Sequence, residues 1–145
     1  MSSGSNVMRV VLEQVGPAAF EATAEGSGGK LVVDGSKEIG GEDRGMRPME
    51  VLLAATASCS AMDVVSILRK QKEPLEGLRI EIDGERAAGV TPSPYVSMKL
   101  VFVAKGDVDP HKLERAVSLA VEKYCSVRAT LAPSVAVTWE ARREP

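Results

Sequence analysis

The sequence predicts an α+β fold with antiparallel strand pairing and the element order βββ-α-ββ-α-β. Three observations predict it. Short runs of β-branched residues fill the first third of the chain, a long stretch without glycine or proline follows Pro48, and apolar residues alternate with charged ones in the segments after that stretch. Since no internal repeat and no linker divides the chain, we expect one domain over residues 1–145.

The N-terminal third is expected to form three short strands and a loop. Turn signals at residues 16–17 and 26–29, all glycine, proline or serine, separate the β-prone runs. The expected strands are residues 8–15, residues 18–25 and Lys30–Asp34, and the polar loop covers residues 36–47.

A long helix is expected at residues 49–72. Pro48 suits the first helical position because a helix needs no N–H hydrogen bond there. Residues 51–62 are apolar or small on every face, which is typical of a helix buried on all sides. A chain of this size has little material to surround such a helix, so we expect a second copy of the chain to help bury it.

The C-terminal half alternates strand and helix signals. Residues 78–83 and 95–104 predict half-buried antiparallel strands, and residues 135–139 predict a last strand. Asp109 and Pro110 predict a helix start, and this second helix is expected to run to about Tyr124. Its apolar face is expected to consist of Leu113, Ala116, Val117, Ala120, Val121 and Tyr124.

Composition excludes several function classes. Apolar residues make up 44% of the chain, which is enough for a packed core, and the net charge of −2 with 3% aromatics argues against a nucleic-acid partner. One His and two Cys are too few for a zinc site, so we expect no metal and no cofactor.

The same reading predicts a cytoplasmic protein. Residues 1–6 contain no secretory signal, and the apolar stretch at residues 51–62 is too short to cross a bilayer, so we expect no membrane partner. In the cytoplasm the two cysteines are expected as thiols, with any disulfide transient.

The two cysteines are the candidate chemical groups. Cys59 lies in the long helix between Ser58 and Ser60, and Cys125 lies where the second helix ends. Arg128 is placed to stabilise a thiolate at Cys125, whereas Asp63, one turn after Cys59, opposes a thiolate there. Two interpretations stay open at this point: a redox pair, or two inert core thiols.

Glu50 is the carboxylate candidate for acid–base work. Nine residues place it about 13 Å from Cys59 along one helix and roughly on the opposite face, so it would have to act from another chain. An acidic residue in a first helical turn is also simply stabilising. His111 is expected on the surface, in the first turn of the second helix.

Two stretches of the chain resemble motifs of the OsmC/Ohr family (osmotically inducible protein C and organic hydroperoxide resistance protein). Residues 47–68 contain Pro-Met-Glu and Cys-Ser-Ala-Met-Asp-Val-Val-Ser, and residues 120–127 contain Glu-Lys-Tyr-Cys-Ser-Val. Their spacing and the element order also match, and the runs are most similar to the YhfA-like branch. The resemblance implies an intertwined homodimer whose long helices pack together.

The resemblance also implies a reaction. Cys59 would be the peroxidatic thiolate that reduces a small organic hydroperoxide, Cys125 would resolve the sulfenic acid as a disulfide, and an external dithiol would reduce the disulfide. We therefore expect a thiol-dependent peroxidase. The alternatives are a redox-sensing or small-molecule-binding dimer with little turnover, and a dimer whose cysteines are only core residues.

The sequence departs from the family pattern at two points that favour the first alternative. Characterised family peroxidases have a glutamate directly after the helix-opening proline, whereas Glu50 stands one position later, and residues 16–34 contain no arginine. The expected replacements are Arg44 or Arg47 from the partner chain, with Glu50 of that chain orienting the guanidinium. Cys59, Cys125, Glu50, Arg47 and Arg44 are thus the predicted catalytic residues.

Overall fold

The computed structural model describes residues 6–144, and the chain divides into two compact units, residues 1–52 and residues 53–145. Most of the segment in which we expected no secretory signal therefore lies outside the described residues. That the chain is a single domain stays a prediction.

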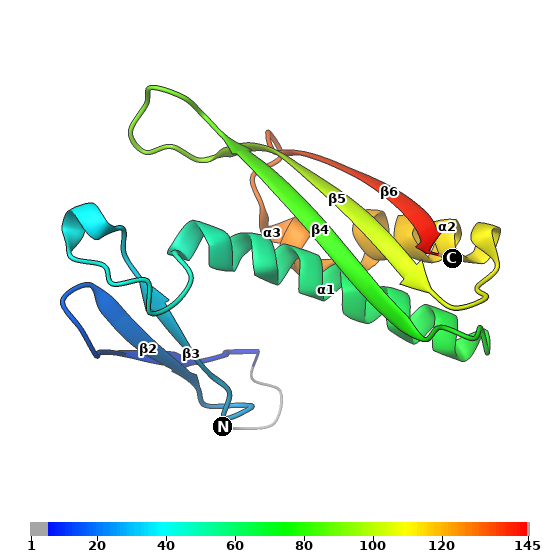
Figure 1. Ribbon diagram of the computed structural model, residues 1–145, viewed down its shortest axis with the longest axis horizontal. Helices are drawn as coiled ribbons and strands as arrows, with labels where there is room; N and C mark the ends of the chain where they lie inside the picture. Colours follow the sequence, from blue (N-terminus) through cyan, green and yellow to red (C-terminus); the bar gives the residue numbers. More distant parts are fainter. Residues whose placement is uncertain (1–5, 145) are drawn as a thin grey trace. The chain divides into compact units, whose positions relative to one another are not determined.

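The first unit is built on a three-stranded antiparallel sheet in the order β1-β2-β3 (Figure 1). The strands are β1 (Val10–Gln14), β2 (Ala19–Ala24) and β3 (Lys30–Asp34), so all three expected strands are confirmed, the third with its predicted bounds. The loop after β3 contains one short 3-10 helix, Lys37–Ile39, which the sequence did not predict.

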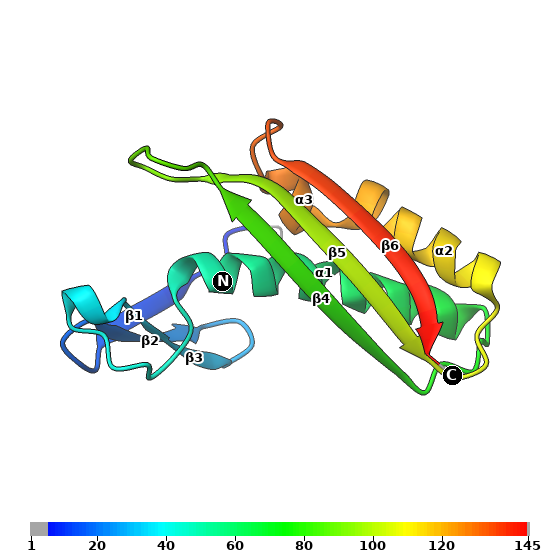
Figure 2. The ribbon, with the colours of Figure 1, turned by 45° about the horizontal axis from the view of Figure 1, so that its top comes forward.

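The second unit is built on the sheet β4-β5-β6. Its strands are β4 (Gly77–Arg86), β5 (Tyr95–Lys105) and β6 (Ala136–Glu144). β4 pairs antiparallel with β5, as expected, but β6 runs parallel to β5 (Figure 2). Fully antiparallel pairing was therefore a wrong prediction. The long helical connection between β5 and β6 returns the chain to the end of the sheet at which β5 begins, so β6 starts beside the start of β5 and runs in the same direction.

That connection consists of α2 (Pro110–Leu119), a π-helical turn at Ala120–Tyr124 and α3 (Ser126–Thr130). Asp109 caps α2 as predicted, since its carboxylate accepts hydrogen bonds from the N–H groups of His111 and Lys112. Tyr124 was expected on the buried face but is 50% exposed. The wider π turn changes the angle between successive side chains, so the face extrapolated at α-helical spacing holds for Ala120 and Val121 and fails at Tyr124.

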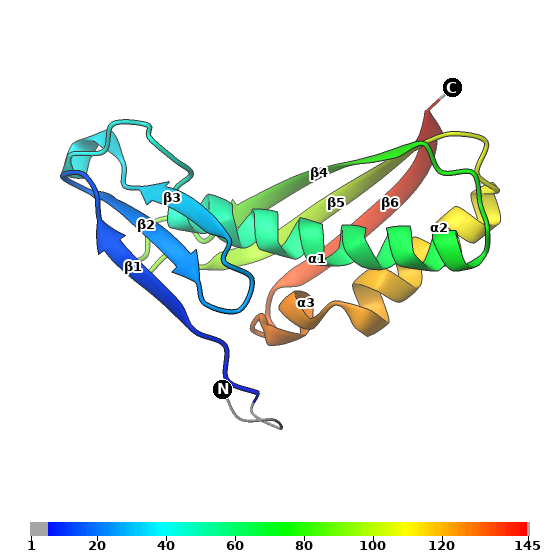
Figure 3. The same cartoon turned by 90° about the horizontal axis from the view of Figure 1, so that it is seen from below.

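The core of the second unit lies between the sheet and the helices, which cover one of its faces (Figure 3). α1, β5, α2 and the π turn contribute most of its fully buried side chains. The buried cluster consists of Val64, Leu68, Leu100, Phe102, Ala104, Val108, Leu113, Ala116, Val117, Ala120 and Val121.

Helix α1 (Pro48–Lys70) begins at the proline, as predicted. Its buried residues form a single stripe at four-residue spacing: Thr56, Ser60, Val64 and Leu68. Within the described chain the helix is therefore not buried on all sides, and Met62 is 69% exposed. Most apolar residues outside the stripe are only half-buried by residues 6–144, which is the condition under which we expected a second chain.

The length of α1 also corrects an estimate made from the sequence. By length and composition alone the helix could span a membrane, because its apolar window extends past Asp63, where the 12-residue estimate stopped. The core helix of a soluble protein meets the same criterion, so one such helix is weak evidence for a membrane.

Candidate thiol site

Cys125 lies at the junction between the π turn and α3, where the backbone changes from helical to extended (φ −70°, ψ 104°). The extended residue turns its side chain inward, and Cys125 is only 4% exposed. Its sulfur accepts a hydrogen bond from the backbone N–H of Arg128 at 3.2 Å, so the thiol acts as the N-cap of α3. The sequence predicted a cysteine at a chain turn, and the structure adds the bond that orients its sulfur.

The same sulfur lies 4.0 Å from the backbone carbonyl oxygen of Thr56 on α1. Thr56 precedes Cys59 by three residues, which is about one helical turn. Both cysteines are free thiols, and Cys59 is half-buried. The structure thus brings Cys125 close to the turn of α1 that carries Cys59, from a distance of 66 positions along the sequence.

A polar network that the sequence analysis missed surrounds this junction. The two carboxylate oxygens of Glu122, on the π turn, accept hydrogen bonds from Trp139 Nε1 at 3.2 Å and from Ser118 Oγ at 3.0 Å. The Trp139 bond first, then the Ser118 bond and the charge of Arg128, hold the pKa of Glu122 below its ordinary value. The four-residue spacing of Ser118 and Glu122 was the available sequence signal, whereas the indole partner depends on where β6 lies.

Arg128 has an unusual side chain for a residue beside a thiol. Its Nε atom is buried and, among residues 6–144, has no hydrogen-bond partner. The guanidinium also forms no ion pair within that part of the chain, although Glu122 lies near enough to feel its charge. Arg128 therefore carries an unused positive donor next to the Cys125 segment.

Glu50 and Arg47 interact with each other at the start of α1. Glu50 Oε1 accepts a hydrogen bond from the Arg47 backbone N–H at 2.8 Å, in the manner of the reaching-back half of a capping box. The Arg47 guanidinium lies 4.0 Å from the same oxygen and 3.6 Å from Asp43 Oδ1. Within its own unit Glu50 thus stabilises a helix N-terminus, and its predicted role at Cys59 stays a prediction.

Arg44 belongs to a loop organised by a buried carboxylate. Asp34, 2% exposed, accepts hydrogen bonds from the backbone N–H groups of Gly35, Glu42 and Arg44. These bonds, that of Glu42 foremost, hold the pKa of Asp34 below its ordinary value. The Arg44 guanidinium donates to the Val15 carbonyl oxygen at 2.6 Å. The sequence analysis missed Asp34, because a last strand residue gives no signal of the loop that folds over it.

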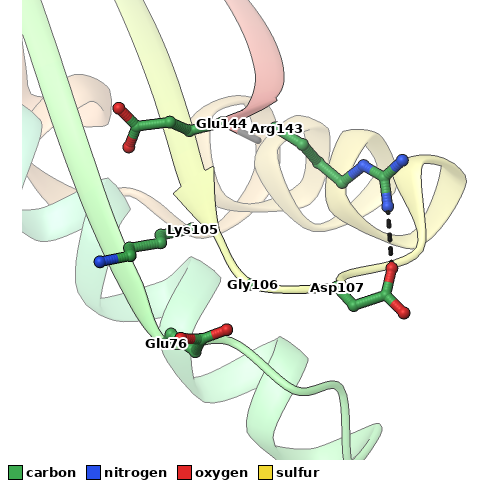
Figure 4. A pocket seen from close by; sticks show the side chains of 6 residues that line it. All are labelled: Glu76, Lys105, Gly106, Asp107, Arg143 and Glu144. Atoms are coloured by element: carbon green, nitrogen blue, oxygen red, sulfur yellow. Dashed lines mark hydrogen bonds and ion pairs between the residues drawn. The ribbon is translucent and has the colours of Figure 1, made fainter.

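A hollow of the second unit lies elsewhere, at the ends of β5 and β6, and has a volume of about 690 Å³ (Figure 4). Charged side chains of both signs line it, and Arg143 Nη1 lies 3.3 Å from Asp107 Oδ1 across its rim. None of the predicted site residues lines it.

Within residues 6–144 no group of three His, Cys, Asp or Glu side chains is arranged to hold a metal ion. His111 lies on the surface of α2, as predicted.

Comparisons with known proteins show what this chain is similar to. The family model for OsmC-like proteins matches residues 40–140. Protein YhfA of Escherichia coli K12 is 35% identical over 113 residues, which cover 77% of this chain and 81% of that protein. A crystal structure of a protein from Aquifex aeolicus VF5 is similar with a TM-score of 0.80 at 35% identity, covering 97% of this chain and all of that one.

More distant structures share the fold alone. The organic hydroperoxide resistance protein OsmC of Legionella pneumophila is 17% identical, with a TM-score of 0.68 over 93% of this chain and 96% of that one.

Proposed function

Because this chain belongs to the OsmC-like protein family, in its YhfA-like branch, we propose that it reduces small organic hydroperoxides with thiols, through Cys59 and Cys125. The observation that carries the proposal is the position of Cys125, whose sulfur lies 4.0 Å from the Thr56 carbonyl oxygen, one turn before Cys59. The hydroperoxide class comes from the resistance proteins that share the fold.

The proposed reaction has three balanced steps. The Cys59 thiolate attacks the terminal peroxide oxygen, the O–O bond breaks, and the alcohol leaves with a proton, which oxidises the sulfur to a sulfenic acid. Cys125 then attacks that sulfur, so that an S–S bond forms and the hydroxide leaves as water. An external dithiol reduces the disulfide by two exchanges and is itself oxidised to a disulfide.

Cys125 is suited to the second step by its surroundings. Burial at 4% exposure keeps bulk thiols away from it, and the N–H bond from Arg128 fixes the direction of its sulfur. A disulfide needs Cα atoms roughly 4.4–6.8 Å apart, so we expect the junction to close any remaining gap by a small shift of the short α3.

The active form that we propose is a cytoplasmic homodimer that is not attached to a membrane. The incompletely buried apolar faces of α1 support self-association, since only one stripe of this apolar helix is fully buried and Met62 is 69% exposed. Arg44 or Arg47 of the partner, oriented by its Glu50, would then stabilise the Cys59 thiolate.

Hydroperoxide consumption by the purified protein with a dithiol reductant tests the proposal. We expect Cys59→Ser to abolish consumption, and Cys125→Ser to permit about one turnover before the sulfenic acid accumulates. Ser58→Ala is the matched control, because Ser58 is an exposed neighbour whose hydroxyl bonds only its own helix at Ala55. Unchanged consumption in Cys59→Ser would exclude the mechanism.

The second candidate is a redox-sensing or small-molecule-binding dimer with little turnover. It is favoured by the contacts of Arg44, Arg47 and Glu50 within their own loop and helix start, where each already has a structural role. Iodoacetamide titration of Cys59 in the Cys125→Ser protein separates the two candidates. A Cys59 pKa clearly below the unperturbed value of about 8.5, raised again by Arg44→Ala or Arg47→Ala, supports the peroxidase, and a value at or above it supports the second candidate.

A further inference from the structure

We propose that Arg128 is a positioning residue for the resolving step: its backbone N–H and its guanidinium, whose buried Nε has no hydrogen-bond partner among residues 6–144, together stabilise Cys125 as the attacking thiolate. This inference rests on the proposed function, because it assigns a role within the same reaction. Arg128 is not among the residues proposed above to activate Cys59, which are Arg44, Arg47 and Glu50. Three observations at the α3 junction support its role.

The first observation is that the Cys125 sulfur has two partners, one of which favours the protonated thiol and the other the thiolate. The carbonyl oxygen of Thr56, at 4.0 Å, can only accept, and so favours the protonated thiol. The N–H of Arg128, at 3.2 Å, can only donate, and bonds a thiolate more strongly than a thiol. The donor bond is the shorter of the two.

The second observation concerns Nε of the Arg128 guanidinium, which is buried and has no hydrogen-bond partner among residues 6–144. A buried donor without a partner costs free energy, so its position needs an explanation such as a partner that is present only in another state. The thiolate of Cys125, three residues earlier on the same short segment, is such a partner. Arg128 is well suited to it, because a guanidinium keeps its charge at every pH at which a thiol titrates.

The third observation is that the nearest carboxylate is already occupied. Glu122 binds Trp139 Nε1 with one oxygen and Ser118 Oγ with the other, so it does not neutralise Arg128 by a direct bond. The other titratable groups on the adjacent turn of α1 and on the π turn are Cys59, Lys123 and Tyr124. Lys123 is exposed, with its ammonium 5.5 Å from the Tyr124 ring centroid, so it does not serve the sulfur.

Alkylation of Cys125 in the Cys59→Ser protein tests the inference without any peroxide. The rate of iodoacetamide labelling would be measured by mass spectrometry between pH 6 and 10 for the parent and for variants at position 128. We expect Arg128→Gln, which keeps the backbone N–H and much of the side-chain length, to raise the pKa of Cys125 by about one unit and to slow labelling at pH 7 about tenfold. Arg128→Lys should stay within about threefold of the parent, because it retains the charge.

A merely structural arginine gives a different pattern. Arg128→Gln and Arg128→Lys would then change labelling equally and without a shift along the pH axis, which would overturn the inference. Arg69→Ala is the matched control, since it removes one exposed positive charge from the end of α1 and should leave the profile unchanged. A profile of Arg128→Gln that coincides with the parent also overturns the inference.

A second measurement connects Arg128 to the reaction. After one equivalent of hydroperoxide, dimedone should trap the Cys59 sulfenic acid in Arg128→Gln, whereas the unmodified protein should yield the Cys59–Cys125 disulfide. Absence of any hydroperoxide consumption by the unmodified protein overturns the proposed function, and the resolving role with it, while the labelling profile still decides whether Arg128 stabilises the thiolate.

Discussion

The two helices that lead to the cysteines differ in how much of their surface the chain itself covers. α2 is amphipathic, and its apolar residues Leu113, Ala116 and Val117 are all at most 1% exposed against the sheet and α1. α1 is apolar nearly all round, yet only one stripe of it is buried, and Met62 on another face is 69% exposed. An amphipathic helix needs one packing surface, whereas an apolar helix needs several.

The apolar residues of the two helices therefore have different roles. The apolar face of α2 belongs to the core of the second unit, and the chain reaches Cys125 through the π turn that follows α2. The faces of α1 beyond the buried stripe are covered only in part within the described chain, and in the proposed dimer a second copy would complete their burial. Substitutions of fully buried residues should therefore lower the free energy of unfolding, whereas substitutions on the exposed face of α1 should weaken self-association.

The largest effect is expected inside the chain. Leu68→Ala should lower the free energy of unfolding by about 3 kcal/mol, because Leu68 is fully buried and its removal leaves a cavity. Urea denaturation measures this loss. Leu113→Ala, the same change on α2, should cost a similar amount. A cost below about 1 kcal/mol for either leucine would show that its site collapses or is not packed as described.

A smaller effect, of a different kind, is expected on the exposed face of α1. If a second copy covers Met62, then Met62→Glu buries an unpaired charge and should weaken self-association about thirtyfold, or about 2 kcal/mol. Sedimentation velocity over a range of protein concentrations measures it. Gln71→Glu adds the same charge at an exposed polar residue just after the helix and should have no effect. Unchanged association in Met62→Glu would mean that this face stays in water.

The smallest effect is expected at the start of α2 and depends on pH. Backbone N–H bonds, that of Lys112 foremost, hold the pKa of Asp109 below its ordinary value of 3.8. A pKa that is lower in the folded than in the unfolded chain stabilises the fold above the unfolded value, and this stability is lost as the pH falls through the folded one. The urea midpoint should therefore fall between about pH 5 and pH 3.

Asp109→Asn tests the origin of that pH dependence. Asparagine caps a helix about as well as aspartate but does not titrate, so stability at pH 7 should change little while the loss in acid becomes smaller. An equal loss in acid for both proteins would assign the effect to other carboxylates, of which Asp34 and Glu122 also have lowered pKa values.

Much of the fold could be predicted from the sequence, for local reasons. Pro48 and Asp109 mark helix starts through single-residue backbone properties, and β3 has its predicted bounds because turn residues delimit a β-branched run. Both cysteines were recognised from their motifs. The π turn was missed, because a switch from α to π hydrogen bonding changes no local propensity and depends on how α2 packs.

The sequence by itself determined the element order, the helix starts, the family and the two thiols, because each of these depends on residue types at fixed spacing. Only the tertiary structure decided the parallel position of β6, the Glu122–Trp139 bond and the unpaired Nε of Arg128. It alone brought Cys125 against the turn of α1 at Thr56. Such features join residues that are distant along the chain, and the packing that joins them depends on the whole core rather than on any local pattern.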